Sequence, residues 1–163
     1  MLYAVIVIFC VALDQLVKYL VRANIPLGES IPFLPHIMDL TYIQNTGAAF
    51  SMLNRHTWLL TLVSLAASAA VAVLMVKAFR HPWGRLPLAL VLAGAVGNLI
   101  DRAAFGFVND MFETTFINFA VFNVADICVV VGGIAAGIYY LFLMDKLEPK
   151  AEGEPHGKPE ADR

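Results

Sequence analysis

Charged residues are scarce in this chain, and positive charge is not in excess. Only 15% of the 163 residues are Asp, Glu, Lys or Arg, whereas 60% are hydrophobic. This composition excludes an ordinary soluble domain and is typical of a protein that lies in a lipid bilayer. The formal net charge is −2, so the chain lacks the basic surface of a nucleic-acid-binding protein. We therefore expect membrane lipids, and no nucleic acid, among its partners.

The chain also lacks the motifs of disulfide, zinc and serine-hydrolase chemistry. Cys10 and Cys128 stand in apolar runs without CxxC or Cys/His spacing, and we interpret them as small buried hydrophobic residues. The four histidines are scattered and form no HExxH motif, and no GxSxG motif occurs. Zinc and serine-hydrolase mechanisms are therefore not expected.

A cleavable leader is not expected either. No Lys or Arg precedes the run MLYAVIVIFCVAL, and bulky Phe9 occupies the position before Cys10 where a cleavage site requires a small residue. The first apolar run is predicted to remain as a membrane span.

Four long apolar runs dominate the sequence. They cover about residues 2–22, 57–76, 86–105 and 117–144, and each is near the roughly 20 residues that a helix needs to cross the hydrocarbon core. We predict an all-α polytopic membrane protein with four transmembrane helices, formed by residues 1–147. An even number of spans returns the chain to its starting side.

The distribution of basic residues predicts the orientation. The segment KAFRHPWGR, residues 77–85, holds three basic residues and no acid, so the positive-inside rule makes it cytoplasmic, together with both termini. Residues 23–56, with Arg55 as their only basic residue, and residues 106–116, with none, are then outside.

The segments between and after the spans differ in character. Residues 23–56 contain several prolines, and IMDLTYIQ at 37–44 is rich in β-branched and aromatic residues, so we predict a small exoplasmic β-containing domain at the membrane surface. Residues 148–163 mix Pro, Gly and charge with almost no apolar residues, which predicts a disordered cytoplasmic tail without chemistry.

Small residues in the spans indicate where helices pack. Gly133 and Gly137 form a GxxxG spacing, and Gly94 with Gly97 would also let two backbones approach. The alternative is that lipid-facing positions simply tolerate small residues.

Two sets of polar residues lie within the apolar runs at helical spacing. Asp14, Lys18 and Arg22 recur at every fourth position, so they share a face on which Asp14 and Lys18 can pair. We favour a structural ion pair with Lys18 snorkelling over a direct catalytic role. Asn98, Asp101 and Arg102 form a second polar face, which we interpret as support for loops and neighbouring carboxylates.

Asp110 and Asp126 differ because neither has a basic partner at helical spacing, and both fall near the predicted exoplasmic edge. Facing each other, two carboxylates would share one proton, so that one could act as general base and the other as general acid. The alternative is that each is separately solvated at the membrane surface. Glu113 and Asp39 are weaker candidates, expected to face water.

Two other functional classes remain open from the residues alone. A proton-coupled transporter could relay protons through Asp14, Asp110 and Asp126, although it would require carboxylates spread across the membrane depth. A noncatalytic membrane scaffold would leave the two carboxylates at one edge unexplained.

Five sequence blocks together resemble the bacterial lipoprotein signal peptidases, or signal peptidase II. The blocks are DQLVK at 14–18, QNTGAAFS at 44–51, GAVGNLIDR at 94–102, FVNDMF at 107–112 and FNVADICV at 122–129. The resemblance covers nearly the whole chain up to the tail. Met111 and Ile127 depart from the residues common in the family, but neither replaces a catalytic group.

The resemblance implies an intramembrane aspartic endopeptidase of the bacterial inner membrane, sensitive to globomycin. Such an enzyme cleaves a diacylglyceryl-modified prolipoprotein before its lipidated cysteine, without a metal or organic cofactor, and we expect a monomer. The family pattern carries the catalytic dyad to Asp110 and Asp126. Residues that it marks around the site are Asp14, Lys18, Asn45, Gly47, Asn98, Asp101, Arg102 and Asn123.

Overall fold

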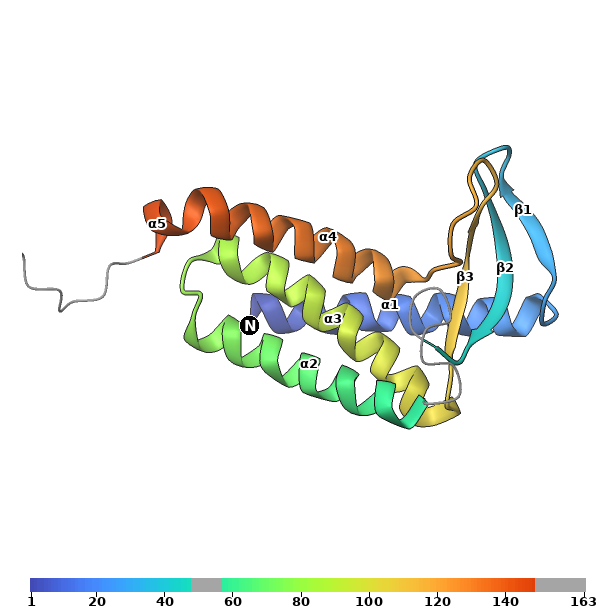
Figure 1. Ribbon diagram of the computed structural model, residues 1–163, viewed down its shortest axis with the longest axis horizontal. Coiled ribbons are helices and arrows are strands. Elements are labelled where there is room, and N and C mark those ends of the chain that lie inside the picture. Colours follow the sequence, from blue (N-terminus) through green and yellow to red (C-terminus); the bar gives the residue numbers. More distant parts are fainter. Residues whose placement is uncertain (48–56, 149–163) are drawn as a thin grey trace, which may run out of the picture.

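Four long helices lie side by side, and a small sheet stands at one end of them (Figure 1). The structure is a computed structural model that describes residues 1–47 and 57–148. The helices are α1 Leu2–Asn24, α2 Thr57–Lys77, α3 Pro82–Phe105 and α4 Val124–Ile138, which continues through the π-helical turn η2 Tyr139–Leu143 into α5 Met144–Leu147. The strands are β1 Ser30–Leu34, β2 Met38–Asn45 and β3 Val108–Thr114. We call the end with the sheet the sheet end, and the end with the α2–α3 connection and α5 the loop end.

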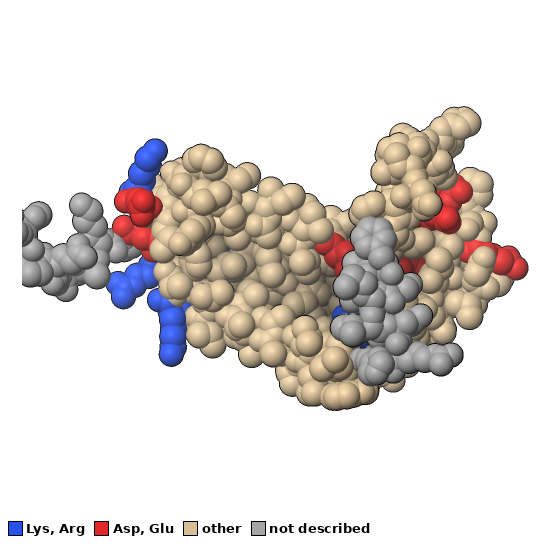
Figure 2. All heavy atoms as spheres, viewed as in Figure 1, with Lys and Arg blue, Asp and Glu red and all other residues tan. Residues whose placement is uncertain are grey.

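The helices have the length and surface of membrane spans. Within the described residues, four segments are long and apolar enough to cross a bilayer: Leu2–Asn24, Trp58–Lys77, Pro82–Phe105 and Val124–Leu147. Large apolar side chains are exposed along them, as at Ile8, Leu62 and Ile134. Charged residues gather at the two ends of the molecule and leave a wide uncharged band between them on the visible face (Figure 2). These features confirm the predicted polytopic membrane class.

The third helix begins earlier than predicted. The apolar run indicated a start near residue 86, but α3 starts at Pro82, with the His81 side chain accepting a hydrogen bond from the Trp83 N–H as N-cap. Proline is favoured in the first helical turn because its missing N–H would have no partner there. The helix ends at Phe105 and is capped by Gly106, whose φ of 78° is a left-handed conformation that glycine adopts readily.

The fourth helix begins later than predicted. The apolar run from residue 117 suggested helix, but the chain remains non-helical until Asn123, whose backbone is extended, caps the start of α4 at Val124. Phe122 instead pairs with Phe112 of β3 through backbone hydrogen bonds. Apolar composition alone could not distinguish this extended approach from a helical turn.

The sheet is antiparallel with the order β1-β2-β3. Strand β2 confirms the strand predicted at 37–44, whereas β3 lies in the predicted 106–116 loop, for which no strand was predicted. The β2–β3 register places Ile43 opposite Asp110 and Asn45 opposite Val108. The sheet therefore carries one of the predicted catalytic carboxylates.

Small residues bring the helices together, although not at the GxxxG pair. A Cβ added at Gly94 or Gly97 would collide with Ala125 and Asp14 respectively, so close packing at this pair is confirmed. Among the residues that the structure describes, no neighbouring atom lies within 4 Å of such a Cβ at Gly133 or Gly137. The packing prediction for these two was wrong, and the neighbouring Gly132 meets α3 instead.

The predicted tail begins one residue too early. The Glu148 carboxylate accepts hydrogen bonds from the backbone N–H groups of Arg80 and His81 and from the Tyr139 hydroxyl, at 2.8–3.2 Å. Glu148 thus joins the end of the chain to the α2–α3 connection. The rest of the predicted tail and residues 48–56 of the predicted outer loop lie outside the described residues.

Candidate active site

An ion pair inside the bundle underlies the site. Lys18 Nζ lies 2.9 Å from Asp14 Oδ2, and both side chains are only 1% exposed. Lys18 also donates to Asn98 Oδ1 at 3.0 Å and lies 3.4 Å from Asp101 Oδ2. The predicted pair is confirmed, but the expectation that Lys18 snorkels was wrong. Its ammonium group instead points into the bundle, where three oxygens surround it.

Arg22 shares a helix face with this pair but makes a different contact. Its guanidinium carbon lies 4.5 Å from the ring centroid of Phe105, a cation–π arrangement. Arg22 therefore ties α1 to the end of α3 at the sheet end.

Asp14 also holds the start of α4. Its Oδ1 accepts a hydrogen bond from the Ala125 N–H at 2.8 Å, which is one of the backbone donors left free at a helix N-terminus. Gly97 makes this approach possible because an added Cβ would lie 2.7 Å from Asp14 Oδ2. The first turn of α4, which carries Asp126, is thereby fixed against α1.

Asp101 performs the corresponding task for β3. Its Oδ2 accepts from the backbone N–H of Asn109 at 2.9 Å and from the Asn109 amide at 2.8 Å. Its Oδ1 accepts from Gln15 Nε2 at 3.1 Å. Because Asn109 directly precedes Asp110 in β3, this contact fixes the backbone next to Asp110 and so helps to position the Asp110 side chain.

Gln15 and Asn109 were missed by the sequence reasoning. Gln15 also donates to Gly97 O at 3.1 Å, and Asn109 is completely buried. Gln15 offered a signal, since an amide within an apolar span is costly unless it has partners. Asn109 offered none, because the strand that buries it was not predicted.

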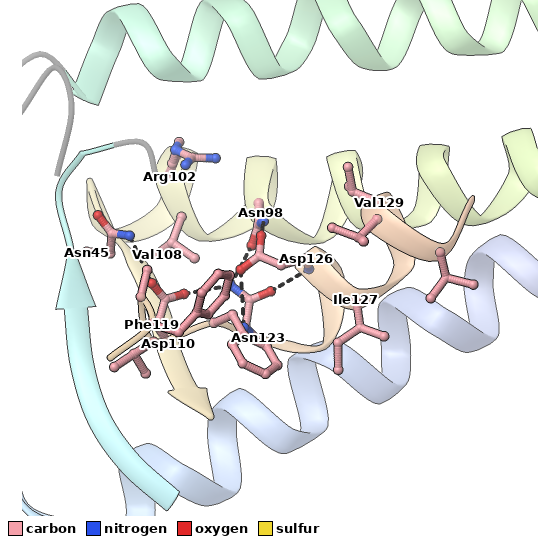
Figure 3. A pocket seen from close by; sticks show the side chains of 15 residues that line it. Asn45, Asn98, Arg102, Val108, Asp110, Phe119, Asn123, Asp126, Ile127 and Val129 are labelled. Carbon is pink, nitrogen blue, oxygen red and sulfur yellow. Dashed lines mark hydrogen bonds between the residues drawn. The ribbon is translucent and has the colours of Figure 1, made fainter. Parts of the chain in front are cut away.

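Asp110 is a buried carboxyl held by two amides. Asn123 Nδ2 donates to its Oδ1 at 2.7 Å, and Asn45 Nδ2 donates to its Oδ2 at 2.9 Å (Figure 3). Gly47 in turn fixes Asn45 by donating its N–H to Asn45 Oδ1 at 2.9 Å. Burial raises the pKa of Asp110 to about 6, the amide of Asn45 opposes this rise, and the nearby charge of Asp126 adds to it.

Asp126 stands in the first turn of α4 and is half-buried. Its Oδ1 accepts from Asn98 Nδ2 at 2.7 Å, and its Oδ2 accepts from the Asn123 N–H at 3.2 Å. The Asp126 N–H donates back to Asn123 Oδ1 at 2.9 Å, which completes a capping box. A helix N-terminus favours a negative charge at this position.

Asn123 links the two carboxyl groups. Its Oδ1 is occupied by the Asp126 N–H, so its amide nitrogen must point the other way, toward Asp110 Oδ1 and Asn98 Oδ1. Lys18 likewise fixes Asn98, because it donates to Asn98 Oδ1 and leaves Nδ2 for Asp126. The orientation of both amides therefore follows from their partners.

Arg102 borders the site from α3. Its Nη1 donates to Ser64 Oγ of α2 at 3.2 Å, and its Nε is buried without a hydrogen-bond partner among the described residues. It lines the same pocket as Asp110 and Asp126. The predicted polar face on α3 thus divides. Asp101 turns into the buried network, Arg102 lines the pocket, and Asn98 takes part in both.

A pocket of about 460 Å³ contains both carboxyl groups (Figure 3). Its polar part consists of Asn45, Asn98, Arg102, Asp110, Asn123 and Asp126. Its apolar part consists of Val108, residues 119–122, Ile127 and residues 129–131. Two carboxyls in one pocket, one of them with a raised pKa, are suited to general acid–base chemistry.

The weaker acidic candidates lie elsewhere on the sheet. Asp39 and Glu113 face each other across β2 and β3. Glu113 accepts hydrogen bonds from the hydroxyls of Thr41 and Ser30, and neither acid lines the pocket.

Comparison with known proteins finds relatives along most of the chain. The family model described as signal peptidase (SPase) II matches residues 6–142. The lipoprotein signal peptidase of Enterococcus faecalis is 42% identical over 140 residues, covering 85% of this chain and 87% of the relative. That of Clostridioides difficile is 41% identical over 146 residues, covering 90% and 99% respectively.

Solved structures agree as well. A bacterial membrane enzyme structure obtained by the in meso method at 2.3 Å resolution superposes with a TM-score of 0.81 at 28% identity, covering 93% of this chain and 94% of the other. A second such structure, at 1.9 Å resolution, gives 0.79 at 29% identity and covers 86% and 92%. With the family model spanning both carboxylates and all four helices, the chain belongs to the signal peptidase II family.

Proposed function

We propose that this protein is an aspartic endopeptidase that removes the signal peptide from diacylglyceryl-modified prolipoproteins by cleaving before the lipidated cysteine. The observation that carries the proposal is the position of Asp110 and Asp126 in one pocket, joined through Asn123. Family membership and the names of the relatives support the substrate class.

The surroundings of the two acids suggest how they divide the work. Asp110 has a pKa raised to about 6 and is the better holder of a shared proton. Asp126, at a helix N-terminus, accepts hydrogen bonds from Asn98 and from the Asn123 N–H, and we assign it the role of the base. Asp126 would take a proton from water as the oxygen attacks the scissile carbonyl, while Asp110 protonates the carbonyl oxygen. Asp126 then gives its proton to the amide nitrogen, and the C–N bond breaks to release the new N-terminus. As the carbonyl forms again, the hydroxyl proton returns to Asp110, which restores the shared proton.

The buried network limits how many negative charges the site can hold. Within the described part of the chain, Lys18 is the one cation buried beside Asp14 and Asp101, and Arg102 borders the pocket. Two further ionised carboxylates at Asp110 and Asp126 would leave negative charge in excess in a poorly solvated region. This imbalance favours one shared proton on the pair.

The pocket fits an apolar substrate segment. Its wall on α4 includes Val129 and Val130, which belong to a membrane span and are exposed on its surface. A signal peptide could approach along this flank without leaving the lipid, and the diacylglyceryl group of its cysteine could remain in the bilayer. We propose that the enzyme works as a monomer without a metal or organic cofactor.

We also propose an orientation in the bacterial cytoplasmic membrane. The loop end carries Lys77, Arg80 and Arg85, so the positive-inside rule assigns it, with both termini, to the cytoplasm. The pocket and sheet are then exoplasmic. In a variant without native cysteines, a membrane-impermeant maleimide added to intact cells should label Glu29→Cys but not Arg80→Cys. Labelling of Arg80→Cys alone would reverse the orientation.

The proposed activity is tested with the purified protein in lipid and a diacylglyceryl prolipoprotein. Mass spectrometry of the products should locate cleavage immediately before the modified cysteine. Asp110→Asn and Asp126→Asn should each lower kcat by about 100-fold to 10,000-fold, because an amide cannot exchange the proton. The double variant should be little worse than either single variant, since the two groups act as a unit.

Asp39→Asn provides the matched control, because Asp39 lies on the same sheet outside the pocket. It should cleave at the parent rate. Near-parent cleavage by either dyad variant would remove that residue from the mechanism, and cleavage at another bond would overturn the proposed specificity.

A further inference from the structure

An apolar projection at the edge of the sheet has no role in the chemistry. The end of β1 with the β1–β2 turn, residues 33–37, and the start of the β3–α4 connection, residues 115–117, form what we call the sheet tip. Its exposed apolar side chains are Phe33, Leu34, Ile37, Phe116 and Ile117, with exposed fractions from 43% to 64%. A contiguous apolar surface of this kind marks an interaction site more often than an isolated exposed side chain does.

The two halves of the sheet tip are joined and locally constrained. The Thr115 N–H donates to Ile37 O at 3.0 Å, which holds the connection against the turn. Within the turn, the Ile37 N–H donates to Leu34 O at 3.0 Å, and His36 has a φ of 63°. Proline at the second position and positive φ at the third are features of a type II turn, although glycine usually takes the third position. His36, a residue with a side chain, thus adopts a positive φ that is uncommon for residues other than glycine, and the turn is held in this conformation by its surroundings.

The place of the sheet tip indicates what it contacts. In Figure 1 the β1–β2 turn and the β3–α4 connection both project sideways past α4, beyond the outline of the helices. Residues Val130, Val131 and Ile134 are exposed on α4, which is part of a membrane span. Lipids packed against the helices would therefore have their headgroups at the level where this projection leaves the bundle. The sheet tip continues the lipid-facing surface of the protein.

The charge pattern of the sheet tip indicates which kind of membrane contact it can make. Residues 33–37 and 115–117 contain no Lys, Arg, Asp or Glu, and no Lys or Arg occurs anywhere in 23–47 or 103–123. Electrostatic attraction to anionic headgroups or to an acidic protein would require basic side chains. Aromatic and branched apolar side chains without charge instead suit the boundary between headgroups and acyl chains.

We propose that the sheet tip inserts into the headgroup–acyl boundary of the bilayer and anchors the sheet to the membrane by apolar contact. The anchor is coupled to the pocket through the chain itself. From the sheet tip the connection runs through residues 119–122, which line the pocket, to Asn123. Phe122 is fixed to Phe112 of β3 by backbone hydrogen bonds at 2.8 and 3.2 Å. Insertion of the sheet tip into lipid would thus restrict the motion of the pocket wall formed by residues 119–122, beside Asp110.

Depth-dependent fluorescence quenching tests the proposal without any activity measurement. The full-length protein with Trp58→Phe and Trp83→Phe is reconstituted in phosphatidylcholine vesicles, and Phe116→Trp or Ile37→Trp is added as the single reporter. Both substitutions place an aromatic residue at an exposed position, so folding should be preserved. Brominated phosphatidylcholine should quench either reporter, and aqueous iodide should have little effect.

Glu29→Trp is the matched control, because Glu29 is exposed just before β1, away from the turn. It should be quenched by iodide and not by the brominated lipid. Replacing part of the phosphatidylcholine by phosphatidylglycerol, or adding salt, should leave quenching at Phe116→Trp unchanged.

Three results would overturn the proposal. Iodide quenching of the tip reporters with no effect of brominated lipid would place the tip in water. This holds even if adding a lipoprotein substrate then reduced the iodide quenching. Equal lipid quenching of Glu29→Trp would mean that the whole sheet lies in the bilayer. Quenching that requires anionic lipid or disappears in salt would indicate an electrostatic contact.

Discussion

Asn123 and Asp126 bind each other reciprocally across the first turn of α4. The Asn123 N–H donates to Asp126 Oδ2 at 3.2 Å, and the Asp126 N–H donates to Asn123 Oδ1 at 2.9 Å. A capping box normally serves only to begin a helix. Here it also fixes one member of the proposed dyad, and it turns the remaining amide group of Asn123 toward the other member, Asp110.

This double role predicts that helix capping and catalysis can be separated at Asn123. In Asn123→Ser the hydroxyl can still cap the helix, so stability should stay close to that of the parent, whereas Asn123→Ala should lose about 1 kcal/mol. Neither variant has the side-chain amide that donates to Asp110, so both should lose about 100-fold in kcat. Thermal unfolding and cleavage kinetics check the two parts. Parent activity in Asn123→Ser would show that the Asn123–Asp110 bond does not matter.

A second prediction distinguishes the buried cation from the peripheral one on the same helix face. Lys18→Met would leave Asp14 and Asp101 without their cationic partner inside the bundle, which should cost about 3 to 5 kcal/mol. Arg22→Met is the matched control, because Arg22 forms a cation–π contact with the Phe105 ring, whose loss should cost about 0.5 to 1 kcal/mol. Thermal unfolding in detergent compares them. Equal shifts in the two variants would contradict the importance of the buried network.

Much of this arrangement could be predicted because the sequence carries strong local signals. The four spans follow from apolar runs of sufficient length, and the Asp14–Lys18 pair follows from helical spacing. Asp110 and Asp126 stood out because charges near the membrane edge without local partners require an explanation. What brings these groups together is long-range: Asp14 reaches Ala125, and Asp101 reaches Asn109. Spacing along a single helix does not reveal such contacts.

The errors in the sequence prediction have a common cause: local patterns do not show the tertiary contacts that decide where an element begins, packs or ends. Hydropathy treats the segment from residue 117 as part of a span, but backbone pairing with β3 and the cap at Asn123 delay the helix. GxxxG spacing identifies small residues without indicating which side of the helix meets a neighbour, so Gly133 was chosen where Gly132 packs. Glu148 looked like part of a polar tail because its partners, including Tyr139, are supplied by tertiary structure.

Glu148 predicts a pH-dependent contribution to stability. Burial alone would raise its pKa, but hydrogen bonds from Tyr139 and from the backbone of Arg80 and His81 outweigh that effect and lower it below the usual 4.5. The folded state therefore binds this proton less tightly than the unfolded state does. The stabilisation is fully present above about pH 4.5 and is lost as pH falls through the folded-state pKa.

The measurement is the difference in melting temperature between the parent and Glu148→Gln across pH. The difference should be constant at neutral pH and should shrink below about pH 4.5. Asp145→Asn is the control, since Asp145 is an exposed carboxylate in the same helical turn region, and it should change little. A difference that persists unchanged at acidic pH would mean that the Glu148 charge does not contribute.

The last prediction concerns the pH dependence of cleavage. If Asp110 donates a proton, the free enzyme must hold that proton, and its fraction falls as pH rises through about 6. The alkaline limb of kcat/KM, which reports the free enzyme, should therefore have an apparent pKa near 6. The Asn45 amide lowers the pKa of Asp110, so Asn45→Ala should move this limb to higher pH. Gln44→Ala, the adjacent residue of β2, should leave it in place. A limb that stays fixed in Asn45→Ala, or moves to lower pH, would mean that Asp110 is not the group whose deprotonation ends catalysis.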